Sequence, residues 1–207
     1  MKLYYSPGTC ALAPHIVALE AGIPLELVKV DLKTKTVKSE GDYWAINPKG
    51  YVPTLELDNG ERLTEGPAIT QYLADLKPVS RLAPENGSFA RVRLQEMLNY
   101  ITSEIHKTYS PLFKPEVLPQ VREERSAYLK RRYAYLEKWL EGKNYLVGDH
   151  LTIADVYFFV VTRWADGVKL DFSEFPRLEA LQKRVGSRKA VLQALREEGL
   201  IPEDKAA

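Results

Sequence analysis

The fold of this chain is decided by residues 2–22, KLYYSPGTCALAPHIVALEAG. Residues 2–5 alternate weakly between inward and outward side chains, as a short strand does, and the breaker cluster at residues 6–9, Ser-Pro-Gly-Thr, ends that strand. Apolar side chains then recur at helical spacing over residues 11–21 and stop at a glycine. The stretch therefore predicts a strand, a turn and a helix.

Pro14 sets where this helix begins. Proline is tolerated only in the first turn, because it lacks the N–H that an interior position must donate. The helix should therefore start near Ala11 and leave Cys10 just outside its N-terminus. Leu25 to Val30 is apolar and β-branched enough to form a second strand, so the chain opens with a βαβ unit.

The segment that follows the second strand is harder to assign. Residues 31–50 are polar and lack periodicity, which predicts irregular structure. Thr54–Leu57 and Arg62–Thr64 flank Asn59-Gly60, a pair that suits a type I′ turn, so we expect an antiparallel hairpin. A helix from about Glu65 to Leu76 completes the order βαβ, irregular segment, ββα.

This order is that of a thioredoxin-like α/β domain, which we assign to residues 1–77. Residues 78–88 contain two Pro, one Gly, one Asn and two Ser and have the composition of a linker. Residues 89–207 have helical periodicity and predict an all-α domain.

Three features mark helices in that second domain. The apolar stripe of the first predicted helix stops near Pro111, and the next helix ends at Gly142. In a third, Thr152 and Asp155 form a capping-box variant at the N-terminus. Further helices are expected from Pro176 and from about Ser187. The first two helices are marked by Leu94, Leu98, Ile101 and Ile105, and by Tyr128, Arg132, Tyr135 and Trp139.

Composition excludes several classes of function. The 29 basic side chains nearly balance the 28 acidic ones without a dense basic cluster, so we expect no nucleic-acid partner. The first residues lack the apolar stretch of a secretory signal, and the apolar run at residues 156–161 is far shorter than the ~20 residues that span a bilayer. A single cysteine forms no internal disulfide and no thiolate metal site, which suits a cytoplasmic protein without a metal.

Five stretches of the chain resemble the soluble glutathione transferases, most closely the bacterial beta class, which has a cysteine in its active site. Matching stretches cover nearly the whole chain in the family's order, across both predicted domains. Each is weak alone, and together they are specific. They are residues 4–10 (YYSPGTC), 47–53 (NPKGYVP), 63–69 (LTEGPAI), 99–107 and 151–155 (LTIAD).

Cys10 is the first site residue that this resemblance implies. A lone cysteine is commonly a small buried hydrophobe, and that alternative stays open. At a helix N-terminus, however, amide N–H groups favour the thiolate, so we expect the pKa of Cys10 to fall from about 8.5 toward 7 or below. The resemblance implies that Cys10 lies beside the sulfur of glutathione and exchanges with it as a mixed disulfide.

The other implied glutathione contacts are mostly backbone groups. The resemblance implies a cis Val52-Pro53 bond, whose Val52 N–H and C=O pair with the peptide of glutathione, although most X-Pro bonds are trans. Gly66 N–H binds the γ-glutamyl carboxylate and Glu65 the α-ammonium, or both are simply helix-start residues. Gly66 stands where many relatives have Ser. The resemblance implies that Lys35 contacts the glycine carboxylate, with Lys33 and Lys38 as neighbouring alternatives.

The resemblance implies that the all-α domain contacts glutathione through side chains. Asn99, Ser103 and His106 share one helical face, which by itself suits a solvated surface. The resemblance implies that this face borders the active site, with His106 and Lys107 near the sulfurs. The resemblance also implies a hydrophobic co-substrate pocket lined by aromatic residues, although aromatic residues at helical spacing are equally typical of a protein core. His15 and His150 are interpreted as structural. The pocket residues are Tyr109, Phe113 and Trp164.

These residues predict a glutathione transferase that conjugates glutathione, as co-substrate, to small hydrophobic electrophiles. Cys10 and His106 are its expected catalytic residues, and the family implies a homodimer without membrane or nucleic-acid partners. Two alternatives remain. One is a glutathione-dependent reductase or dehalogenase in which Cys10 carries the covalent exchange, and the other is a non-catalytic, transferase-like binding protein.

Overall fold

The computed structural model describes residues 1–202, which form two compact units. The first unit runs from Met1 to Leu82 and also takes in the segment from Ser187 onward, and the second runs from Ala83 to Gly186. The predicted domains at 1–77 and 89–207 stay a prediction, but the last helix packs within the first unit. In residues 1–202, no helix combines the length and the hydropathy that a membrane crossing requires.

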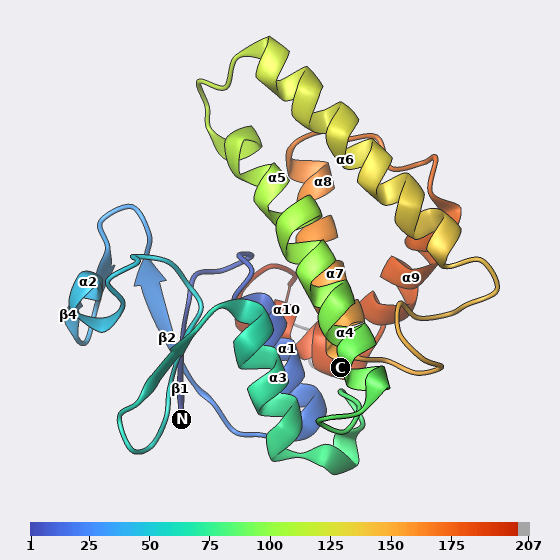
Figure 1. The fold of residues 1–207 in the computed structure, drawn as a ribbon. Helices are drawn as coiled ribbons and strands as arrows, with labels where there is room; N and C mark the ends of the chain where they lie inside the picture. Colours follow the sequence, from blue (N-terminus) through green and yellow to red (C-terminus); the bar gives the residue numbers. More distant parts are fainter. Residues whose placement is uncertain (203–207) are drawn as a thin grey trace. The chain divides into compact units, whose positions relative to one another are not determined.

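The first unit is built on a six-stranded mixed sheet in the order β4-β3-β2-β1-β5-β6. Only β1 and β2 run parallel, and the other neighbours are antiparallel, which confirms the thioredoxin-like arrangement. Figure 1 shows β1, β2 and β4 to the left of the helices α1 (Leu12–Ala21) and α3 (Gly66–Leu76). The central strand β1 is almost wholly buried. The strands are β1 Lys2–Tyr5, β2 Glu26–Asp31, β3 Thr36–Val37, β4 Gly41–Asp42, β5 Thr54–Glu56 and β6 Arg62–Thr64.

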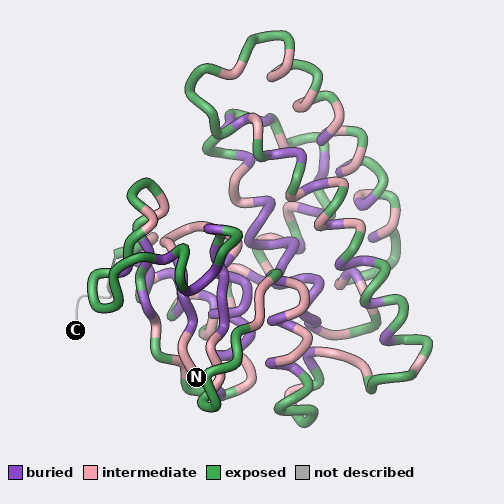
Figure 2. Tube along the Cα trace, turned by 60° about the vertical axis from the view of Figure 1, so that its left-hand side comes forward, coloured by how far each residue is buried: buried purple, intermediate pink, exposed green. Residues whose placement is uncertain are grey.

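Helix α1 (Leu12–Ala21) is the centre of the helical layer in this unit. It packs against both α3 (Gly66–Leu76) and α10 (Lys189–Glu197), and every residue from Leu12 to Ala18 is buried. Figure 2 shows this inner part in purple, with the turns around it largely green. Helix α1 begins one residue later than predicted and leaves Cys10 outside its first turn, as expected.

The interpretation of residues 31–50 as irregular is wrong in part. This segment forms the two-residue strands β3 and β4, the short helix α2 (Tyr43–Ile46) and tight turns between them. Asp31 Oδ1 closes the first turn by accepting the N–H groups of Lys33 and Thr34 at 2.8 and 3.1 Å. Strands of two residues are too short to produce the alternation by which a strand is recognised.

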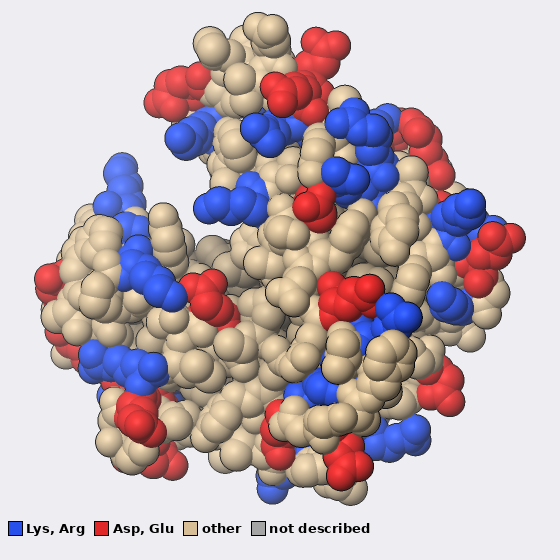
Figure 3. Space-filling view, viewed as in Figure 1, with Lys and Arg blue, Asp and Glu red and all other residues tan. Residues whose placement is uncertain are grey.

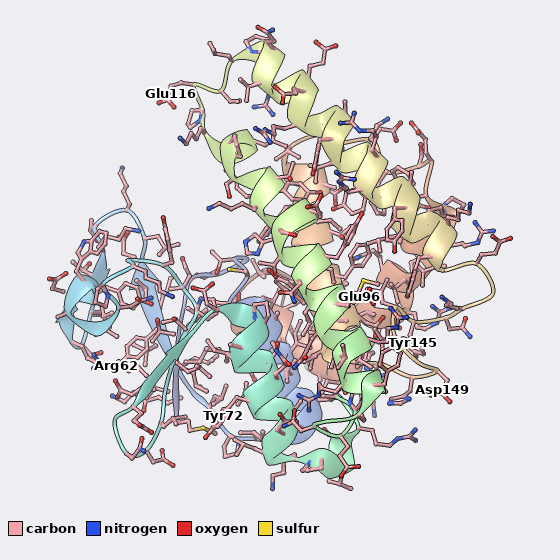
Figure 4. The ribbon with its side chains drawn as sticks, viewed as in Figure 1. Arg62, Tyr72, Glu96, Glu116, Tyr145 and Asp149 are labelled. Atoms are coloured by element: carbon pink, nitrogen blue, oxygen red, sulfur yellow. The ribbon has the colours of Figure 1, made fainter. Side chains whose placement is uncertain are left out.

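The predicted hairpin is present, but its turn differs. Strands β5 and β6 pair antiparallel, as expected. Gly60 has a φ of 84°, whereas Asn59 does not have the positive φ that a type I′ turn requires. Gly60 N–H donates to Leu57 O at 2.9 Å and Leu57 N–H donates to Glu61 O at 2.8 Å, which makes a three-residue loop. Arg62, labelled in Figure 4, begins the edge strand β6 and donates through Nε to Glu56 at 2.8 Å.

The second unit is helical, as predicted. Its apolar stripe, Leu94, Leu98, Ile101 and Ile105, is buried, which confirms the predicted inner face. One departure is that residues 101–106 form a π-helical turn between two α-helical segments. The helices are α4 Phe89–Tyr100, η2 Ile101–His106, α5 Lys107–Tyr109, η3 Ser110–Phe113, α6 Pro119–Trp139, α7 Ile153–Thr162, α8 Trp164–Gly167 and α9 Pro176–Gly186.

Helix α7 is the buried centre of this unit. All ten of its residues are buried, and the predicted capping pair at its N-terminus is confirmed. Asp155 accepts the N–H of Thr152 at 2.8 Å through one carboxylate oxygen and the N–H of Leu146 at 2.7 Å through the other. Burial raises the pKa of Asp155 to about 6, although these hydrogen bonds act in the opposite direction.

Candidate functional site

Cys10 lies at the N-terminus of α1, beside the start of β5. Thr9 Oγ1 closes the preceding turn by donating to Ser6 O at 2.6 Å. Cys10 as a residue is partly exposed, and its Sγ donates to the carbonyl oxygen of Val52 at 3.4 Å. The structure therefore brings together two residues that are 42 positions apart and that the resemblance assigns to one site.

The expectation of a lowered Cys10 pKa is wrong. Burial raises the pKa of the thiol to about 12, and the Glu65 carboxylate contributes in the same direction. The N–H groups of Cys10 and Ala11 do lower the pKa, as the helix-terminus argument required, but they are outweighed. Protein replaces most of the water around the sulfur, and desolvation penalises the charged thiolate more than two amides stabilise it.

The Val52-Pro53 peptide bond is cis, which confirms what the resemblance implied. Buried side chains stabilise the loop before this bond through hydrogen bonds to its backbone. Asn47 Nδ2 and Tyr43 Oη both donate to the carbonyl oxygen of Tyr51, at 2.7 and 2.8 Å. The Val52 backbone, rather than its buried side chain, is thus presented beside Cys10.

The N-terminus of α3 carries the next predicted contacts. Glu65 has a φ of 70°, a left-handed conformation that costs a non-glycine residue on the order of 1–3 kcal/mol. Its carbonyl accepts the N–H groups of Ala68 and Ile69, both at 3.0 Å, and Pro67 has no N–H. Gly66 N–H, at the first helical position, has no carbonyl four residues back within the helix to bond to.

The Glu65 side chain is exposed and pairs with a lysine that sequence reasoning missed. Lys49 Nζ lies 2.6 Å from Glu65 Oε1 and 2.9 Å from Thr64 Oγ1. The only sequence signal was the position of Lys49 within the Asn47–Pro53 motif. Lys35, the predicted carboxylate contact, donates through Nζ to Gly50 O at 2.8 Å and so lies against the same loop.

In the second unit, the predicted polar face lies on and beside the π-helical turn. Asn99, Ser103 and Lys107 are exposed and His106 is partly exposed. Ser103 Oγ donates to Asn99 O at 3.0 Å. The i→i+5 hydrogen bonding of a π-helix widens the turn, so the spacing assumed for an α-helix does not hold here; such turns are frequent at functional sites.

The three predicted pocket residues do come together in an aromatic cluster. The Trp164 ring lies edge-on to Tyr109 and Phe113, with centroids 5.7 and 5.4 Å away. Tyr109 is fully buried and its hydroxyl lies 2.8 Å from that of Tyr133, so it forms the base of the cluster. Phe113 and Trp164 retain exposed surface.

His106 joins this cluster through a residue that the sequence did not indicate. Its Nδ1 lies 2.5 Å from the hydroxyl of Tyr157, and its ring is edge-on to Trp164 at 4.9 Å. Tyr157 is in the middle of the wholly buried α7. Nothing in the sequence separates it from the other apolar positions of that helix.

His15, interpreted as structural, has two carboxylate partners from the C-terminal segment. Its Nε2 lies 2.7 Å from Glu197 and its Nδ1 lies 3.1 Å from Glu198. Glu198 also accepts the N–H of Gly8 at 2.9 Å, so a buried carboxylate holds the loop that leads to Cys10. His150 pairs with the neighbouring Asp149 at the surface.

Charge is distributed without a dominant patch on the face drawn in Figure 3, where basic and acidic side chains are interspersed. Among residues 1–202, no group of three or more His, Cys, Asp and Glu side chains is arranged to hold a metal ion. The groups described above that can act on a ligand are the Cys10 thiol, the backbone donors around it and the His106 cluster.

Comparison with known proteins identifies both units. A family model described as "Glutathione S-transferase, N-terminal domain" matches residues 8–76, and one described as "Glutathione S-transferase, C-terminal domain" matches residues 100–189. Glutathione S-transferase GstA of Escherichia coli O157:H7 is 43% identical over 200 residues, which cover 97% of this chain and 100% of that protein.

Two solved structures extend the match to the fold. The bacterial beta class glutathione S-transferase of Sphingomonas chungbukensis is 43% identical with a TM-score of 0.94, covering 97% of this chain and 100% of that one. A sphingomonad glutathione S-transferase, solved in complex with glutathione, is 42% identical with a TM-score of 0.93 over the same shares.

Proposed function

Since the chain belongs to the glutathione S-transferase family and is a transferase, we propose that it binds glutathione at the residues gathered around Cys10 and conjugates it to small hydrophobic electrophiles. The observation that carries this is the contact between Cys10 Sγ and the Val52 carbonyl next to a cis proline. The backbone of Val52 is the edge with which the cysteinyl part of a peptide would pair.

The ends of glutathione are assigned by charge. The γ-glutamyl carboxylate accepts from Gly66 N–H, and its α-ammonium pairs with Glu65. The 2.6 Å pair between Lys49 and Glu65 supports this, because an ammonium already fits against that carboxylate. At the other end, Lys35 takes the glycine carboxylate, and its position against Gly50 supports that assignment.

In the proposed reaction, the sulfur of glutathione forms a bond to an electrophilic carbon, and the leaving group departs with its electron pair. The proton lost by the thiol goes to solvent. By the family resemblance, Asn99, Ser103, His106 and Lys107 act near this sulfur. The cluster of Tyr109, Phe113 and Trp164 supplies the apolar surface for the electrophile.

The raised pKa of Cys10 decides its role in this proposal. At neutral pH the group remains a thiol, which donates a hydrogen bond as it does to Val52. It therefore assists conjugation as a donor to the glutathione thiolate. The second candidate, a reductase or dehalogenase with covalent exchange at Cys10, is favoured by one observation, namely that Cys10 is partly exposed.

We also propose an oligomeric state and a location. The family resemblance supports a homodimer, and a cytoplasmic location suits a protein whose single cysteine is unpaired. Sedimentation should give twice the 23.5 kDa of the chain at micromolar concentration.

The test of function is the conjugation of 1-chloro-2,4-dinitrobenzene, followed by absorbance, with glutathione or N-acetylcysteine as the thiol. Glutathione should be conjugated at an accelerated rate and N-acetylcysteine hardly at all, because it lacks the γ-glutamyl group that Glu65 and Gly66 bind. Equal acceleration of both thiols would contradict the proposed glutathione site, and no acceleration of either would contradict the transferase activity.

A further inference from the structure

The hydrogen bond between His106 and Tyr157 is the shortest side-chain contact of the aromatic cluster. His106 ends the π-helical turn η2, whereas Tyr157 lies in α7, 51 positions later. Tyr157 is 1% exposed. A buried phenol that reaches a partly exposed imidazole at 2.5 Å is placed to fix which of the two ring nitrogens carries the proton.

The chemistry of the two groups identifies the donor. A phenol O–H is a stronger hydrogen-bond donor than the N–H of a neutral imidazole, and the unprotonated ring nitrogen is a stronger acceptor than a phenol oxygen. The Tyr157 hydroxyl therefore donates and Nδ1 of His106 accepts. A neutral imidazole that accepts at Nδ1 carries its proton on Nε2.

The neighbouring threonine agrees with this assignment. Thr102 Oγ1 donates to Leu98 O at 2.8 Å, and its contact with the Tyr157 hydroxyl is much longer, at 3.5 Å. The single Thr102 proton is thus directed at the helix backbone and does not compete for the Tyr157 oxygen. His106 Nδ1, at 2.5 Å, lies closer to the phenol oxygen than Thr102 Oγ1 does, at 3.5 Å.

Aromatic packing fixes the orientation of the imidazole as well. The His106 ring is edge-on to Trp164 at 4.9 Å and to Tyr157 at 5.7 Å, with interplanar angles of 64° and 69°. Edge-on rings at these distances are favourable and restrict rotation about the side chain. Both the tautomer and the ring plane of His106 are therefore set by the helical unit itself.

We propose that Tyr157 is a positioning residue that holds His106 as the Nε2–H tautomer, so that His106 meets the glutathione sulfur as a hydrogen-bond donor and not as the base that removes its proton. This inference rests on the proposed function for its second half. The first half concerns the free protein and stands on the geometry of this unit. The thiol proton of glutathione then goes to water, and Nε2–H stabilises the thiolate that remains.

The test combines nitrogen-15 NMR of the imidazoles with steady-state kinetics. The chain has three histidines, so His106 is assigned by the signals that disappear in His106→Gln. In the ligand-free protein at a pH where His106 is neutral, the parent should show the Nε2–H pattern. Tyr157→Phe should shift it toward a mixture of tautomers and lower kcat about 5- to 10-fold, as expected for one lost hydrogen bond.

Tyr133→Phe is the matched control, because it removes another fully buried phenol from the same unit, one that bonds to Tyr109. It should leave the His106 pattern and kcat unchanged. A parent with the Nδ1–H pattern, a Tyr157→Phe pattern identical to the parent, or an equal effect of both variants would overturn the proposal. A parent without conjugation activity would instead refute the proposed function, and the tautomer would be decided by NMR alone.

Discussion

The two units present their candidate groups in different ways. Around Cys10, the ligand-facing groups are largely backbone: the Val52 peptide next to a cis proline and the Gly66 N–H at the start of α3. Around His106 they are side chains that meet across helices, as Tyr157 and Trp164 do. Backbone groups are set by Pro and Gly in the local sequence, whereas side-chain clusters depend on packing. The first kind of site should tolerate side-chain changes better than the second.

Cys10→Ala gives the largest expected effect and tests the one side chain on which the backbone site depends. Covalent exchange with glutathione disulfide should be lost completely, because no other cysteine exists in the chain. Conjugation should largely remain, since glutathione supplies its own thiol. Mass spectrometry of the mixed disulfide and the conjugation assay measure the two. Loss of both activities would make Cys10 essential to activation.

The acid–base behaviour of Cys10 offers an independent measurement. Iodoacetamide alkylation of the parent should show an apparent pKa well above the ordinary 8.5, because burial raises it. An apparent pKa near 7 would restore the helix-terminus account and favour the covalent mechanism.

Asp155→Ala should have the largest effect on stability, because it leaves the buried N–H groups of Leu146 and Thr152 without their acceptor. We expect a loss of about 3 kcal/mol in the free energy of unfolding, measured by urea denaturation. Asp171→Ala is the control, since Asp171 is exposed and accepts hydrogen bonds from Ser173 within its own turn. Similar losses in the two variants would contradict the burial argument.

The pH dependence of Asp155 has a definite sign. Its pKa is raised from 3.8 to about 6 in the folded chain, so the folded state holds the proton more tightly than the unfolded state. The stabilisation from protonated Asp155 is fully present below about pH 4 and is lost as the pH rises through 6. Asp155→Asn, which is always neutral, should therefore compare less favourably with the parent at pH 5 than at pH 7.5.

Glu198→Ala would show how far the backbone site depends on a side chain. It removes the buried acceptor of Gly8 N–H and one partner of His15, so stability should fall by about 2 kcal/mol and Cys10 should alkylate faster. Glu197→Ala removes the more exposed partner of His15 and should change both less. Unchanged alkylation in Glu198→Ala would show that the Cys10 loop holds its conformation without this carboxylate.

Gly66→Ser has the smallest expected effect, and it tests whether a side-chain donor can strengthen a contact that the backbone makes alone. An added Cβ would meet only Pro53 Cγ, at 4.0 Å, and the φ of Gly66 is not positive, so a side chain fits. The serine hydroxyl adds a donor for the γ-glutamyl carboxylate and should tighten glutathione binding by about 1 kcal/mol. Gly50→Ser is the contrasting variant, because its Cβ would lie 2.6 Å from Trp44. Weaker binding in Gly66→Ser would mean that the carboxylate lies elsewhere.

The backbone features around Cys10 could be predicted from the sequence better than the side-chain contacts around His106. Pro14, the Val52-Pro53 motif and Gly66 act on the local chain, so their consequences could be predicted from the sequence with the family's help. The raised pKa of Cys10 could not, because desolvation depends on what packs around the sulfur. The partners Lys49 and Tyr157 were missed for the same reason: each pair joins residues that are far apart in sequence, and a π-helical turn displaces His106 from its α-helical position.

Calorimetric titration of glutathione into the parent and into Glu65→Ala tests the central claim, that the γ-glutamyl end binds at the N-terminus of α3. Loss of a charge-assisted pair worth roughly 1.5–3 kcal/mol should weaken binding by about 10-fold or more. Glu61→Ala removes an exposed carboxylate at the loop between β5 and β6, four residues before Glu65, and is the control that should bind as the parent does. If Glu65→Ala binds glutathione as tightly as the parent and Glu61→Ala, the placement of glutathione on this chain is wrong.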